Sequence, residues 1–165
     1  MTFLKKSKAI NEILNELSCE IRIRKTEFYN VKLDYFVISL YGEFEKELDL
    51  IIEKKLNFKN NFGKNYISFI KINDSKLHRG LKGNKFKDFI KKVFNIEVSD
   101  LVPNTDWEIF LAFIEFRHAI AHSLKTYKQK KDALTLKIND TKDLLASLEK
   151  ILTNLDNLAR IRLCN

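Results

Sequence analysis

The feature that most constrains the fold of this chain is an almost uninterrupted apolar segment that leads directly into charged residues. From position 107 to position 116 the apolar side chains are Trp107, Ile109, Phe110, Leu111, Ala112, Phe113, Ile114 and Phe116. A surface helix carries one apolar stripe, whereas a helix that is apolar on nearly every side must be buried on several sides. Arg117, His118 and His122 follow at once. Because a buried charge without a partner is costly, we expect this helix to end in a cleft or a subunit interface, and we place the candidate site there.

Helical periodicity extends to four other segments of the chain. Apolar residues recur at helical spacing over residues 3–24, about 31–56, 84–94, and from Asp140 or Thr141 onward. In the central helix, Thr105 and Glu108 have the spacing of a capping box, which predicts that the helix starts there. We expect loops at residues 57–65 and 125–138, which are polar or basic, and at residues 95–104, which end at the sole proline, Pro103.

The composition agrees with a helical domain. Only four glycines and one proline occur among 165 residues, which is few for a sheet with many turns, and the length suits one domain with an adequate core. We therefore predict an all-α fold, a single bundle of about five helices over residues 1–165. In this bundle an N-terminal helix within residues 1–25 packs on the helices of residues 31–160.

The predicted helix over residues 31–56 carries acidic residues whose positions bear on the site. At about 100° per residue, Glu43 and Glu47 fall at the edge of its apolar stripe, whereas Glu45 points to solvent. A carboxylate on the core side of a helix usually has a basic partner, and Arg117 is a candidate. The alternative is that Glu43 and Glu47 both extend outward into water.

The charge of the chain suits an anionic partner. The net charge is +8 and the isoelectric point is about 9.4, which favours RNA as that partner. Candidate RNA contacts are Arg79 and Lys82 in a basic, glycine-containing segment, and Lys125 and Lys128 beyond the central helix. The alternative is that lysine is abundant through an AT-rich coding bias, and that these side chains are simply solvated.

The cysteines and the apolar segments of the chain indicate the cellular compartment of the protein. Cys19 and Cys164 lack the spacing of a disulfide framework or a zinc site. The N-terminal residues lack the apolar core of a signal peptide, and no apolar run approaches the roughly 18 residues of a membrane span. We expect a soluble cytoplasmic protein with no membrane association, no metal and no cofactor.

Three interpretations of Arg117, His118 and His122 remain open. The two histidines are four residues apart and share a helix face, but two imidazoles do not complete a zinc site and the glutamate of the protease motif is absent. A second interpretation is structural: Arg117 pairs with Glu43 or Glu47, and both histidines are satisfied in the core. The third is recognition of a known motif.

The segment FRHAIAHS at the end of an apolar helix resembles the signature of the HEPN family of all-α domains, many of which are metal-independent ribonucleases. Its motif is an arginine, often followed by Asn or His, then four to six residues and a histidine. Arg117, His118 and His122 match these positions, and the order of helices over residues 31–160 is similar. HEPN toxins paired with nucleotidyltransferases carry a tyrosine two residues after the motif histidine. Leu124 stands there, which points to another branch of the family, such as one resembling phage-defence nucleases.

The resemblance implies a function that the residue types can perform. RNA can be cut without a metal when its own 2′-hydroxyl attacks the adjacent phosphate. In this hypothesis His122 is the general base or acid, Arg117 binds the phosphate, and His118 orients the site. Five residues along an ideal helix turn a side chain by about 140°, so the site requires a bend, a helix end, or two copies.

HEPN nucleases use two copies, and we therefore expect a homodimer, with RNA as substrate and with an antitoxin or a defence-system protein as a further partner. The alternative function is a non-catalytic HEPN-like module that binds RNA, a nucleotide or a protein.

Overall fold

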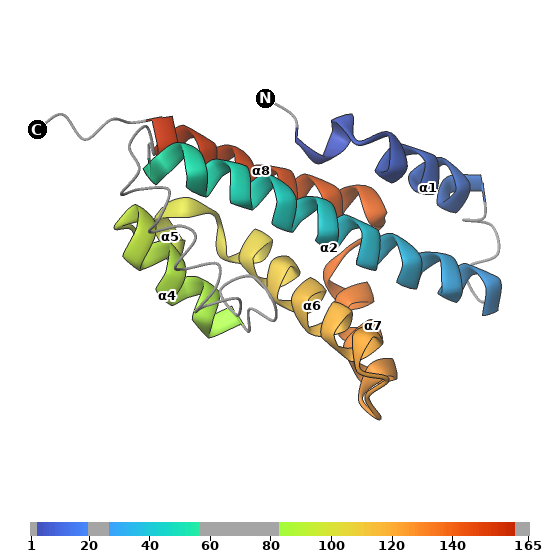
Figure 1. Ribbon diagram of the computed structural model, residues 1–165. Coiled ribbons are helices and arrows are strands. Elements are labelled where there is room, and N and C mark those ends of the chain that lie inside the picture. Colours follow the sequence, from blue (N-terminus) through green and yellow to red (C-terminus); the bar gives the residue numbers. More distant parts are fainter. Residues whose placement is uncertain (1–2, 20–26, 57–82, 161–165) are drawn as a thin grey trace, which may run out of the picture.

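The computed structural model describes residues 3–19, 27–56 and 83–160, and this part of the chain is built from helices without strands (Figure 1). The all-α prediction is therefore confirmed. The estimate of about five helices was too low, because the described residues form seven α-helices and one 3-10 turn. These are the 3-10 turn η1 (Leu4–Lys6), α1 (Lys8–Cys19), α2 (Glu27–Leu56), α4 (Gly83–Phe94), α5 (Val98–Leu101), α6 (Asn104–Ala121), α7 (Tyr127–Lys137) and α8 (Thr141–Arg160).

Helices α2 and α8 form the long axis of the bundle and pack side by side (Figure 1). Helix α1 lies along α2, and α6 packs on both α2 and α8. Helices α6 and α7 form a hairpin that extends from the bundle, with residues 122–126 at its tip. None of the described helices combines the length and apolar content that are needed to cross a bilayer.

Large apolar side chains of α2 and α8 form the core. Their fully buried members include Phe36, Leu40, Phe44, Leu48, Ile51, Leu144, Leu148, Ile151 and Leu155. Each such side chain contributes roughly 1.5–3 kcal/mol when it leaves water. Their helical spacing was the strongest signal in the sequence, which explains why both helices were predicted with the correct type.

An aromatic cluster attaches α4 and α6 to α2. The ring of Phe86 stacks on Trp107 at 5.9 Å between centroids and lies 4.9 Å from Phe110, which in turn lies 5.5 Å from Phe44. Trp107 is 3% exposed and Phe116 is fully buried. Neither side chain therefore leaves apolar surface for a second subunit to cover.

Several predicted helix ends are also corrected. The first helix does not run continuously from residue 3: a 3-10 turn comes first, and α1 begins at Lys8. Helix α2 begins at Glu27, and α6 begins at Asn104 with Pro103 as its N-cap and no side-chain cap hydrogen bond. Thr105 and Glu108 are therefore inside the helix, and the predicted capping box is absent.

Asp106 anchors the start of α6 instead. Its carboxylate accepts hydrogen bonds from Ser147 at 2.8 Å and from Lys150 at 2.7 Å, both on α8. A negative charge in the first turn also suits the helix dipole.

Two of the predicted loops contain helices. Residues 98–101 form α5 within the loop expected at 95–104, and residues 127–137 form α7 within the loop expected at 125–138. Helix α7 buries only one side chain, Leu134, so its sequence shows no apolar stripe. Polar contacts with α2 and α6 stabilise it instead. The loop expected at residues 57–65 lies outside the described residues.

A buried carboxylate joins the ends of α2 and α8. Asp156 is 2% exposed and accepts hydrogen bonds from Lys54 of α2 and, at 2.8 Å, from Arg160 of its own helix. Burial alone would raise the pKa of Asp156, but the hydrogen bonds and charges of Lys54 and Arg160 outweigh it and lower the pKa below 3.8.

Replacement of Asp156 by Asn should destabilise the fold by about 1–3 kcal/mol at pH 7, because two cations lose a charged acceptor. A carboxyl group whose pKa is lowered on folding stabilises the protein above its unfolded pKa, and this contribution disappears as the pH falls through the folded value. The difference between wild type and D156N should therefore shrink in acid. Urea unfolding at several pH values tests this, with the exposed Asp88→Asn as control. Equal effects of the two substitutions would contradict it.

Candidate functional site

The candidate site is built where α6 ends. Helix α6 stops at Ala121, and His122 is its C-cap residue, with φ −111° and ψ 8°. The N–H of Ser123 donates to the carbonyl of Ile120 at 3.2 Å, and the N–H of Leu124 donates to that of Ala119 at 3.1 Å. This pair of hydrogen bonds is the Schellman motif. The helix end, one of the conditions that the sequence set for this site, is therefore present.

Ser123 occupies the position of this motif that usually holds glycine. Its φ is +47°, in the left-handed region that side chains disfavour. This unfavourable backbone conformation directly follows His122, at the point where the candidate histidine leaves the helix.

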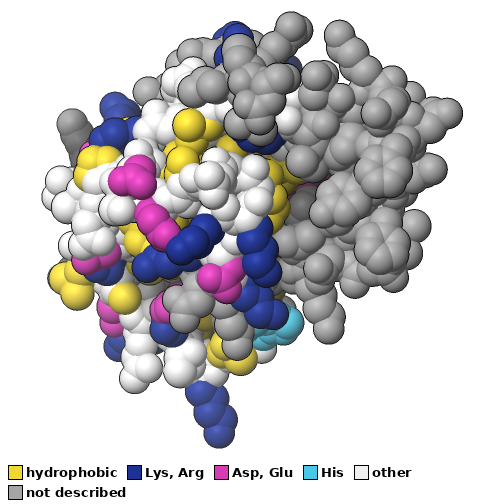
Figure 2. Space-filling view, turned by 90° about the vertical axis from the view of Figure 1, so that its left-hand side faces the viewer, with side chains coloured by type: hydrophobic (Ala, Val, Ile, Leu, Met, Phe, Trp, Pro, Cys, Tyr) yellow, Lys and Arg dark blue, Asp and Glu magenta, His cyan; other side chains and the backbone are white. Residues whose placement is uncertain are grey.

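The two candidate histidines lie together. The rings of His118 and His122 are 4.4 Å apart between centroids and tilted by 57°. The N–H of His122 still donates to the carbonyl of His118 at 3.1 Å, so the last turn remains closed. His122 is exposed and His118 is partly buried, and histidine atoms are visible at the molecular surface in Figure 2.

Arg117 rests on an aromatic ring. Its guanidinium carbon lies 4.3 Å from the centroid of Tyr41, which is 3% exposed and packs at 6.0 Å on Phe113. Such cation–π contacts contribute about 0.5–2 kcal/mol, more when water is excluded. The contact places the cation over the ring without using a carboxylate as its partner. Tyr41 is a site residue that the sequence analysis missed.

The predicted partners of Arg117 are arranged differently. Within the described residues no ion pair joins Arg117 to Glu43 or Glu47, and the Glu43 carboxylate lies 3.6 Å from Lys46 one turn further along α2. Glu45, which was expected to point to solvent, is partly buried with one carboxylate oxygen covered. The charge of Arg117 is thus held by the face of an aromatic ring.

A polar cluster fixes the far end of the loop that carries His122. The Tyr127 hydroxyl, at the start of α7, donates to the Asp34 carboxylate of α2 at 2.5 and 2.7 Å, and Lys131 donates to Asn30 one turn earlier. The Tyr127 ring packs on Phe116 at 5.5 Å. Burial raises the pKa of Asp34 despite the hydrogen bond from Tyr127, and burial lowers the pKa of Lys131. Burial and the adjacent carboxylate together raise the pKa of Tyr127.

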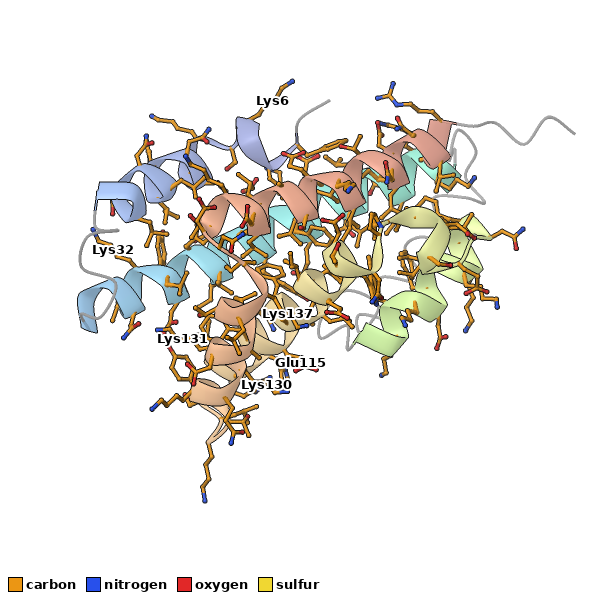
Figure 3. All side chains as sticks on the ribbon, turned by 180° about the vertical axis from the view of Figure 1, so that it is seen from behind. Lys6, Lys32, Glu115, Lys130, Lys131 and Lys137 are labelled. Carbon is orange, nitrogen blue, oxygen red and sulfur yellow. The ribbon has the colours of Figure 1, made fainter. Side chains whose placement is uncertain are left out.

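Several lysines of α7 are committed to contacts within the chain. Lys130 pairs with Glu115, and Lys137 lies 2.7 Å from Glu108, so that both join α7 to α6 (Figure 3). Lys125 and Lys128, two of the predicted RNA contacts, are exposed near the tip of the hairpin. The other two, Arg79 and Lys82, lie outside the described residues.

The site therefore combines Arg117, His118 and His122 on the last turn of α6 with Tyr41 beneath the arginine. No cluster of three or more His, Cys, Asp or Glu side chains with metal-site geometry occurs in the described part of the chain. No protein-family model matches the chain. Comparison with curated proteins and with solved structures likewise found no match.

Substitutions at Ser123 test whether this residue adopts a left-handed backbone conformation at the end of α6. Ser123→Val should destabilise the protein by about 1–2 kcal/mol, because a β-branched side chain opposes positive φ, whereas Ser123→Gly should be neutral or slightly stabilising. Urea unfolding followed by circular dichroism measures both. At Ser99, an exposed residue of α5, the order should reverse, with glycine the less stable. A valine variant at 123 as stable as the glycine variant would refute this account of the turn.

Proposed function

We propose that this protein is a metal-independent endoribonuclease of the HEPN type, acting as a toxin or a phage-defence effector. The observation that carries the proposal is the end of α6, where the Arg117 cation lies over the Tyr41 ring and an exposed His122 leaves the helix one turn after His118. The resemblance of the segment FRHAIAHS to the HEPN signature supplies the reaction, and the geometry supplies groups suited to it.

Arg117 is suited to bind a phosphate. Its charge is permanent, and within the described residues no carboxylate lies within ion-pair distance of it. A guanidinium held by an aromatic face keeps its planar N–H fork for two oxygens of one phosphate. In the reaction this fork stabilises the charge that develops when the 2′-hydroxyl attacks the phosphorus.

His122 is suited to transfer the proton. Imidazole is the side chain best suited to accept and donate protons near neutral pH. Its exposure at the helix end allows RNA to approach it, and the contact with His118 orients its ring. Lys125 and Lys128, exposed on the same hairpin, are suited to contact neighbouring phosphates.

We propose that two copies assemble to complete the site, as in the nucleases that the motif resembles. Among the exposed large apolar residues of the described part, Val31 is 65%, Tyr35 61% and Ile38 46% exposed, and their spacing puts them on one face of α2. This face adjoins Asp34, which holds Tyr127. A symmetric contact between two such faces would bring the two α6–α7 hairpins near one another.

Cleavage of total RNA in EDTA should therefore require Arg117 and His122. His122→Ala should reduce the rate by about 10²–10⁴-fold, the usual contribution of a general acid or base. Arg117→Lys should also impair cleavage, because it keeps the charge and loses the planar fork. Products should end in 2′,3′-cyclic phosphate or 3′-phosphate.

The control for this experiment is Lys8→Ala, which removes a cation that is 90% exposed on α1 and should leave the rate unchanged. Circular dichroism establishes that each variant is folded. RNA that stays intact with wild type but shifts on a gel would favour a binding module, and cleavage that persists in H122A would remove the histidine from the mechanism.

Sedimentation at micromolar concentration should give wild type twice the chain mass of 19.5 kDa. Tyr35→Glu places a charge in the apolar face of α2 and should shift the protein to monomer, with loss of cleavage. The matched variant Leu136→Glu, at an 88% exposed position on α7, should remain dimeric. A monomeric wild type would overturn the composite site.

A further inference from the structure

We propose that His118 and His122 form a two-imidazole binding site for a divalent transition-metal ion, which blocks the site. The proposal concerns regulation of the candidate site and rests on the proposed function only for its effect on RNA cleavage. The binding of the metal itself is independent of that function. The observation behind it is the 4.4 Å separation of the two rings on one closed helical turn.

The spacing of the pair matches a known way of holding such ions. Two histidines at positions i and i+4 of a helix present their imidazoles on one face, as in the zinc proteases. With zinc–nitrogen bonds of about 2.0–2.1 Å in tetrahedral geometry, the two ligand nitrogens lie roughly 3.3 Å apart. The two ring centres are 4.4 Å apart, so the imidazoles already lie within the range over which one ion could contact both after the side chains adjust.

The backbone at this point preserves the geometry. His122 is the C-cap residue, but its N–H donates to the carbonyl of His118 at 3.1 Å, so the two residues still span one helical turn. The Schellman hydrogen bonds of Ser123 and Leu124 fix the turn from the other side. A pre-formed pair loses little conformational freedom on binding, which favours affinity.

The neighbouring side chains explain why the site should be reversible. Glu115, one turn before His118 on α6, is the nearest acidic candidate for a third ligand along that face, but it pairs with Lys130. No three-ligand group was found in the described residues. A structural zinc site has four protein ligands, so a two-imidazole site leaves open coordination positions and exchanges its ion readily.

The choice of ion follows from the ligands. Imidazole suits copper, nickel and zinc, whereas magnesium and calcium prefer oxygen. A bound ion occupies the lone pair through which His122 would accept a proton, so it stops proton transfer at that nitrogen. A nuclease that works in chelator would thus be inhibited by free zinc and restored when the chelator removes it.

Calorimetric titration of the purified, metal-free protein with ZnCl2 and with NiCl2 tests the site directly. We expect one ion per chain with wild type, and binding at least roughly 100-fold weaker with His118→Ala or His122→Ala, because the second contact is then no longer intramolecular. His78→Ala removes the third histidine of the chain and should bind like wild type. MgCl2 should give no binding.

The outcomes separate this inference from the proposed function. Zinc binding that is unchanged in both H118A and H122A, or absent from wild type, overturns the inference whether or not RNA is cut. Binding that requires both histidines establishes the site even if no cleavage occurs. Where wild type does cut RNA, zinc should inhibit it and EDTA should restore it, and cleavage that persists at saturating zinc overturns the blocking role. His118→Gln, which keeps a polar side chain, replaces H118A if that variant fails to fold.

Discussion

Two aromatic pairs hold α6 along α2: Tyr41 with Phe113 at 6.0 Å, and Phe44 with Phe110 at 5.5 Å. Pairs of this kind contribute about 0.5–1.5 kcal/mol beyond the area that they bury. These pairs also fix the position of the last turn of α6. Because Phe113 is fixed on Tyr41, the next turn of α6 brings Arg117 onto the same ring, and the helix ends a turn later at the surface. The exposure of His122 and the placement of Arg117 both follow from this contact.

The parts of the fold that were predicted from sequence depend on local repetition. Leu40, Phe44 and Leu48 recur at helical spacing and are all buried, so the type of α2 could be inferred without its neighbours. The position of Arg117, His118 and His122 at the end of a buried helix was inferred in the same way. The end itself could not be distinguished from a bend, because it depends on Ser123 adopting positive φ, which nothing in its local sequence requires.

The features that sequence reasoning missed arise from contacts between distant segments. Helix α7 is rich in lysine and buries one leucine, and it is held by bonds from Tyr127 to Asp34, from Lys130 to Glu115 and from Lys137 to Glu108. None of these partners is visible in the pattern of α7 itself. The contact of Tyr41 with Arg117 was missed for the same reason, because the two residues lie on different helices, α2 and α6, far apart in the sequence.

The stacking of Trp107 on Phe86 has a practical consequence. The chain has a single tryptophan, and its indole is enclosed between α4 and α6, parallel to the Phe86 ring within 9° and with the Lys87 ammonium 5.8 Å from its centroid. Its fluorescence therefore reports on one junction of the molecule, the seating of α4 against α6. The emission spectrum of the unmodified protein offers an optical record of whether that junction opens when a partner is added.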